Sequence, residues 1–85
     1  MTLKPQNRRR HARRATKTGA LLREAREKKK LTLSDVEEAT GLMGGGISHL
    51  ENGRNMPSFK TAIILCELYK LPLQVLAEAV KEDEL

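Results

Sequence analysis

The side chains best suited to bind a charged ligand form a cluster near the start of the chain. The cluster comprises Arg8, Arg9, Arg10, Arg13 and Arg14. With Lys4 and Lys17, these residues give segment 1–17 seven basic and no acidic residues, whereas residues 18–85 hold nine basic and eleven acidic ones. Guanidinium groups bind phosphates strongly. We therefore expect residues 1–17 to be a flexible basic arm that follows phosphates or enters a minor groove. A solubilising tail or a nuclear-type address is the alternative.

The other reactive side chains lack the partners that catalysis or metal binding needs. The chain has one cysteine, Cys66, and two histidines, of which His11 lies in the arm and His49 far from it. A disulfide scaffold or a zinc finger is therefore excluded. No serine stands in a pattern that suggests a neighbouring acid and base. We predict that the protein is not an enzyme and uses no cofactor or metal.

Composition excludes further classes of protein. A chain of 85 residues allows one small domain. Aromatic residues make up only 2% of it, which disfavours the stacking platforms of single-strand nucleic-acid binders. No apolar run approaches the roughly 20 residues of a membrane helix. We expect a protein without membrane contact in a reducing cytoplasm, with Cys66 as a free core thiol.

Apolar spacing predicts an all-α domain of five short helices that would position these groups. The predicted helices cover residues 18–30, 33 to about 40, 44–51, 59 to about 69, and 72 or 73 to about 81. Thr32 with Asp35, and Ser58, are the expected N-caps, and Gly41 is the expected left-handed C-cap. The side chains predicted to be buried include Val36, Ala39, Ile47, Leu50, Phe59, Ala62, Ile63, Cys66, Tyr69, Leu73, Leu76 and Val80. The domain should span residues 18–81, followed by an acidic tail, 82–85, that frays.

Several of these segments together resemble a known family. Leu22-Arg23-Glu24-Ala25-Arg26, Gly41-Leu42, Ile47-Ser48-His49-Leu50-Glu51-Asn52-Gly53, Pro57-Ser58-Phe59 and Leu71-Pro72-Leu73 match, in order and spacing, the helix-turn-helix family of Cro and the lambdoid phage repressors, also called the XRE family. The resemblance covers residues 18–78. It implies a five-helix, lambda-repressor-like domain whose recognition helix, about 44–51, enters the major groove of double-stranded DNA.

The resemblance also assigns roles to residues. It implies that Arg26 and Glu51 form a structural brace. The expected DNA contacts are the arm residues Arg8, Arg9, Arg10, Arg13, Arg14 and Lys17, together with Thr32, Ser34, Gly44, Gly45, Gly46, Ser48, His49, Asn52, Arg54 and Asn55. The size and the arm suit small plasmid repressors of the Kor type or restriction–modification controllers. The corresponding location is the bacterial cytoplasm, with the protein associated with the nucleoid when it is bound to DNA.

The recognition helix departs from the family pattern. Met43 stands where a Ser or Thr N-cap is usual, and Gly44, Gly45 and Gly46 occupy the positions of base-reading side chains. Glycine cannot donate a side-chain hydrogen bond to a base and weakens a helix. One hypothesis is that the missing side chains let the helix backbone approach DNA closely. The other is that the reading face has decayed, leaving a protein-interaction module such as an antitoxin or anti-activator.

A single short helix reads few base pairs, which favours a homodimer on an inverted repeat. Apolar residues beyond the predicted core stripes of the last two helices suggest the interface, namely Ile64, Leu68, Val75 and Ala79. The alternative is that these residues thicken the core of the single chain. The chain has no room for a ligand-binding domain, so regulation would come from concentration or a co-regulator protein.

Overall fold

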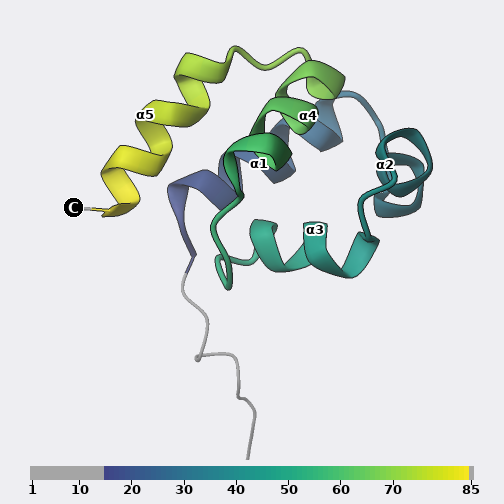
Figure 1. Cartoon of the computed structure of the whole chain (residues 1–85), viewed down its shortest axis with the longest axis horizontal. Helices are drawn as coiled ribbons and strands as arrows, with labels where there is room; N and C mark the ends of the chain where they lie inside the picture. The colour runs from purple at the N-terminus through teal and green to yellow at the C-terminus, as the bar shows by residue number, and fades with distance from the viewer. Residues whose placement is uncertain (1–14, 85) are drawn as a thin grey trace, which may run out of the picture.

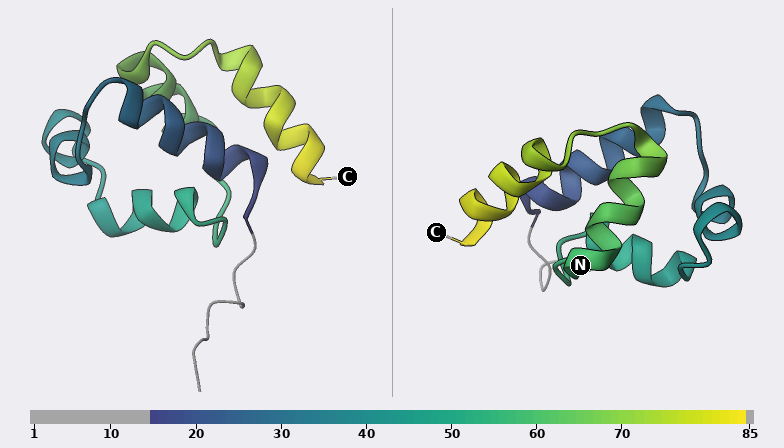
Figure 2. Two further views of the ribbon diagram at one scale, coloured as in Figure 1. Left: turned by 180° about the vertical axis from the view of Figure 1, so that it is seen from behind. Right: turned by 45° about the horizontal axis from the view of Figure 1, so that its top comes forward.

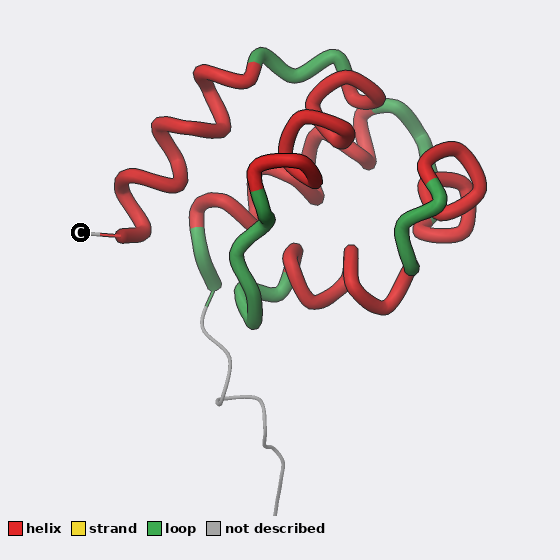
Figure 3. Tube along the Cα trace, in the orientation of Figure 1, coloured by secondary structure: helices red, strands yellow, loops and turns green. Residues whose placement is uncertain are grey.

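The computed structural model describes residues 15–84, so the arginines of the arm lie outside the described residues. Within this range the chain is all-α, as predicted (Figure 1). The helices are α1 (Lys17–Lys28), α2 (Leu33–Thr40), α3 (Gly44–Glu51), α4 (Phe59–Tyr69) and α5 (Leu73–Glu84). Short loops join them (Figure 3). Among the described helices, none combines the length and apolar character needed to cross a bilayer.

Side-chain caps fix where the helices begin. The Thr32 hydroxyl accepts a hydrogen bond from the Asp35 amide at 3.0 Å, and the Asp35 carboxylate accepts one from the Thr32 amide at 2.9 Å. This capping box confirms the predicted start of α2. At the start of α4 the Ser58 hydroxyl accepts a hydrogen bond from the Thr61 amide at 3.2 Å, and Gly41 ends α2 with φ of 81°. The first helix, predicted over residues 18–30 with fraying in the lysine run 28–30, ends at Lys28, and Lys30 adopts a left-handed conformation with φ of 59°.

The core forms where α3, α4 and α5 meet α1, and α2 packs against α3. Figure 2, left, shows α1 (dark blue) running between α5 (yellow) and α3 (teal). The most deeply buried apolar side chains are Leu22, Val36, Ile47, Leu65 and Leu76. One comes from each of the five helices, so the apolar face of each helix is buried only when all five pack together.

The acidic end of the chain does not fray, contrary to the prediction. Helix α5 continues to Glu84, and the Asp83 carboxylate accepts hydrogen bonds from the backbone amides of Lys17 and Thr18 at 2.9 and 2.8 Å. The Lys17 ammonium pairs with Glu82. Because helix N-terminal amides lack partners within their own helix, a carboxylate there is favourable. Glu82 and Asp83 therefore join the domain, and Lys17 is the first residue of α1.

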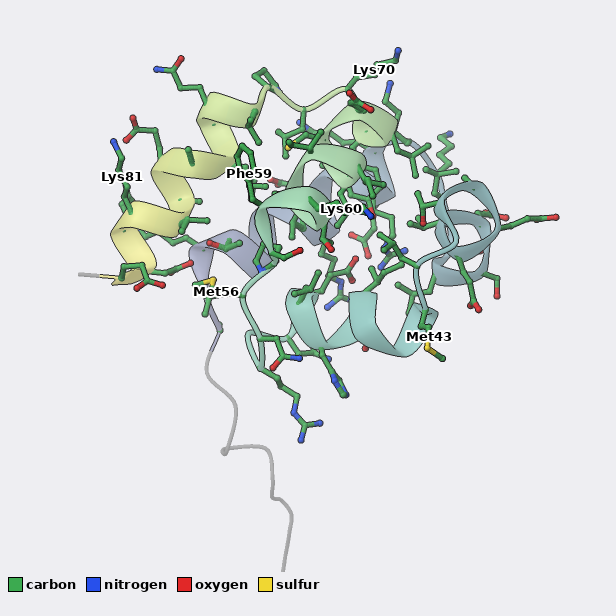
Figure 4. The ribbon with its side chains drawn as sticks, viewed as in Figure 1. Met43, Met56, Phe59, Lys60, Lys70 and Lys81 are labelled. Carbon is green, nitrogen blue, oxygen red and sulfur yellow. The ribbon has the colours of Figure 1, made fainter. Side chains whose placement is uncertain are left out.

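Five side chains predicted to lie in the core are not fully buried. Ala39 is exposed, Phe59 is 74% exposed, Leu73 is 39% exposed, and Ile63 and Val80 are only half-buried. Phe59 begins α4, where no neighbouring helix covers its side chain (Figure 4). Helical spacing identifies an apolar stripe but not how far along the helix the neighbouring elements extend.

Candidate nucleic-acid interface

Helix α3 is held against the domain by its inner face. Ile47 and Leu50 are buried, as predicted from their spacing. The end of α3 lies against the start of α1 at Gly19. A Cβ atom on Gly19 would lie 2.5 Å from the Glu51 carbonyl oxygen and 2.6 Å from that of Leu50. Only glycine permits this approach of two helices, which sets the position of the C-terminal end of α3.

The structure brings Arg26 and Glu51 together. Nε of Arg26 lies 2.7 Å from Oε2 of Glu51, and Nη2 lies 3.0 Å from Oε1, while Nη1 donates to the Leu31 carbonyl at 2.7 Å. The two side chains are 12% and 6% exposed. The hydrogen bond to Glu51 raises the pKa of the Arg26 guanidinium. This bidentate pair ties α1 to the last residue of α3, away from solvent.

Tyr69 lies beside this pair. Its side chain is 3% exposed, and its hydroxyl has no hydrogen-bond partner among the described residues. Burial raises the pKa of Tyr69 to about 12, with a further contribution from the negative charge of Glu51 and an opposing one from Arg26. The raised pKa keeps the buried tyrosine uncharged beside the ion pair well above neutral pH.

The outer face of α3 carries little side-chain mass. Gly45, Gly46 and His49 are exposed, and a Cβ atom on either glycine would meet nothing within 4 Å. Ser48 is half-buried, and its hydroxyl accepts a hydrogen bond from the Asn52 side-chain amide at 3.3 Å. Neither the packing of α3 nor its surroundings in this structure therefore requires glycine at positions 45 and 46.

The first turn of α3 is capped by a residue that the sequence did not reveal. Met43 makes no side-chain cap. Instead the Glu37 carboxylate, from α2, accepts a hydrogen bond from the Gly44 amide at 3.3 Å. A Cβ atom on Gly44 would lie 3.1 Å from the same carboxylate oxygen. This contact joins the two helices, but no spacing rule predicts it because it depends on how α2 and α3 cross.

The other predicted contacts that the structure describes come from outside α3. Arg54 and Asn55 are exposed in the turn after α3, and the Arg54 amide donates to the His49 carbonyl at 2.9 Å. At the start of α2, Ser34 is exposed, while the Thr32 hydroxyl is engaged as the N-cap. The Lys17 ammonium is paired with Glu82. Arg8, Arg9, Arg10, Arg13 and Arg14 lie outside the described residues.

The residues predicted for a dimer interface divide into two groups. Ala79 is 8% exposed and belongs to the buried set of the single chain, which corrects that part of the prediction. Ile64 and Leu68 are half-buried, and Leu68 packs against the core. Val75 is 44% exposed. The alternative, that these residues thicken the chain's own core, therefore holds for Ala79 and in part for Leu68.

Comparison with known proteins agrees with this geometry. Residues 19–82 match the model of a family described as a helix-turn-helix domain. The chain is 38% identical over 60 residues to the ImmF control region 10 kDa protein of Bacillus phage phi105, covering 71% of this chain and 67% of the phage protein.

Two solved structures have a similar fold. The DNA-binding domain of BldD from S. venezulae superposes with a TM-score of 0.65 at 28% identity, covering 73% of this chain and 93% of that domain. The clp gene regulator ClgR from C. glutamicum gives a TM-score of 0.68 at 26% identity, covering 80% of this chain and 88% of its own.

Proposed function

Starting from the membership of this chain in the helix-turn-helix domain family, we propose that it is a sequence-specific repressor of transcription that binds double-stranded DNA. Membership and fold make it a DNA-binding regulator of transcription. The likeness to a phage protein named for a control region supports a role in transcriptional control, and we propose that this role is repression from an inverted-repeat operator. Such a protein acts by occupying promoter DNA and excluding polymerase.

The observation that carries the proposal is that α3 is packed against the domain on one face and exposed on the other. Its inner face is buried through Ile47 and Leu50, its end is held by the pair of Arg26 and Glu51, and its outer face is exposed. A helix fixed on one side and bare on the other can lie in a major groove, which admits a single helix. In this arrangement His49 presents the largest polar side chain of the exposed face of α3, and we assign base contact to it.

We further propose a homodimer, because one eight-residue helix reads too few base pairs to select a site. The exposed apolar side chains that a second copy would cover are Phe59, Leu73 and Val75. In a two-fold dimer the two copies of α3 would enter half-sites about one helical turn apart, or a multiple of that spacing.

Footprinting on DNA from the upstream region of the gene tests the proposal. We expect a symmetric protected stretch, and His49→Ala should still bind but discriminate less between that site and scrambled duplexes. Lys70→Ala is the matched control, because Lys70 is an exposed basic residue that follows α4 as its C-cap. Absence of protection, together with equal affinity for operator and scrambled DNA, would refute sequence-specific repression.

The arm has its own test. Removing residues 1–14 deletes five arginines, and each phosphate contact contributes about 0.9 to the slope of log K against log salt. We expect the truncated protein to bind more weakly and with a flatter salt dependence. Equal affinities of the full and truncated proteins at every salt concentration would remove the arm from the mechanism.

A further inference from the structure

Met43 presents an apolar side chain at the leading end of α3. The residue is the N-cap, its backbone is extended with φ of −76° and ψ of 135°, and its side chain is 74% exposed. In Figure 4 it projects from the end of α3 away from the helical body. An unbranched thioether left this open gains nothing from the fold of the single chain, since hydrophobic stabilisation requires removal from water.

The three residues that follow Met43 carry no side chains. Positions 44 to 46 are all glycine, and the space beside Gly45 and Gly46 is empty to 4 Å. From residue 43 to residue 46, Met43 therefore supplies the only side chain. Whatever side-chain contact this end of α3 makes with DNA must be made by a group that has no hydrogen-bond donor.

The negative charge of Glu37 beside the N-terminus of α3 makes a phosphate an unfavourable neighbour for this end of the helix. The amide of Gly44 already donates to the Glu37 carboxylate at 3.3 Å. That carboxylate places negative charge where a helix N-terminus would otherwise attract a phosphate. The tip of α3 is therefore poorly suited to bind a phosphate, and its remaining side-chain contact is the apolar one that Met43 offers.

On the floor of the major groove, the apolar group within reach is the 5-methyl of thymine. We infer that Met43 is a specificity-determining residue that selects thymine by packing its thioether side chain on the thymine methyl group. The inference rests on the proposed placement of α3 in the major groove. It assigns the selectivity that the three glycines cannot provide to the one neighbouring side chain that remains.

A cycle of protein and DNA substitutions tests the contact. Duplexes that the full chain binds are selected from a random pool, and each thymine of the selected half-site is replaced in turn by uracil, which lacks only the methyl group. Covering one methyl-sized group corresponds to roughly a fourfold change in affinity. We expect one uracil position to weaken binding of the wild-type protein about fourfold and to leave binding of Met43→Ala unchanged.

Two further variants complete the design. Met43→Leu keeps an apolar side chain and should remain sensitive to the same uracil. Met56→Ala removes another exposed methionine, from the loop between α3 and α4, and should leave the thymine preference intact. If no uracil weakens the wild-type protein, or if the loss is the same in Met43→Ala, the assignment is wrong. If the wild-type protein selects no duplex at all, the proposed function fails, and the inference fails with it.

Discussion

The glycines on the outer face of α3 allow stability and DNA binding to be separated. Gly45 and Gly46 are exposed, and a Cβ atom on either would meet nothing within 4 Å. The folded chain alone therefore loses nothing when both become alanine. If the glycines serve close approach to DNA, the two added methyl groups should instead collide with the groove.

The expected gain in stability follows from helix propensity. Replacing glycine by alanine inside a helix contributes up to about 1 kcal/mol, and less in a first turn. With roughly 0.5 kcal/mol for each site, the free energy of unfolding of the double variant should exceed that of the wild type by about 1 kcal/mol. For a domain of this size that corresponds to a rise in Tm of about 4–8 °C.

The expected loss in binding follows from overpacking. Forcing extra methyl groups into a close-packed contact costs roughly 1–3 kcal/mol, which is about a 5- to 150-fold loss of affinity. Thermal unfolding followed by circular dichroism gives the first quantity, and titration of the selected duplex gives the second. Gly41→Ala is the control variant, in which the same change should have the opposite effect on stability. Gly41 also has open space beside it, but its φ is 81°, so alanine there should destabilise the protein.

Two results would refute this reasoning. A double variant that is less stable than the wild type would show that positions 45 and 46 are not free in the folded chain. A variant that is more stable and binds DNA equally well would show that the bare face of α3 does not approach the duplex.

Other parts of the structure lead to further expectations. Gly19→Ala should lower the free energy of unfolding by roughly 1–3 kcal/mol in urea titrations, because its Cβ would lie 2.5 Å from a carbonyl oxygen of α3. Arg26→Ala should cost about 3–5 kcal/mol by leaving Glu51 buried without a partner, and Arg26→Met with Glu51→Leu should cost much less. Tyr69, the one tyrosine of the chain, should titrate at about pH 12 in ultraviolet absorbance, against an ordinary value near 10. Its neutral form is favoured by folding, so this stabilisation is complete below pH 10 and is lost as the pH rises through 12. Phe59→Glu should weaken a dimer at least tenfold in sedimentation experiments, whereas Phe59→Leu should largely preserve it.

Each of these expectations has a contrary outcome. Wild-type stability in Gly19→Ala would mean that α1 and α3 can separate without cost. An equal loss in the single and double variants of the ion pair would mean that the pair stabilises through packing alone. Ionisation of Tyr69 near pH 10 in the folded protein would show that its hydroxyl reaches water. Identical oligomeric states for the wild type and Phe59→Glu would place the subunit interface elsewhere.

Local sequence alone determined where most of the helices begin and end. The capping box at Thr32 and Asp35, the cap at Ser58 and the glycine stop at Gly41 are signals within a few residues of one another. Backbone amides at a helix end must find a partner, and a nearby hydroxyl or carboxylate supplies one whatever the rest of the chain does. The buried pair of Ile47 and Leu50 follows from helical spacing for the same local reason.

The tertiary structure decided what depends on contacts between distant segments. Asp83 closes the start of α1 across 65 or more residues, Glu37 caps α3 from α2, and Gly19 lets α1 touch the end of α3. Phe59 lies on an apolar stripe, yet no helix reaches far enough to cover it. A pattern along one helix specifies which face is apolar, but burial also requires a neighbour of the right length and crossing angle, and only the assembled fold provides that.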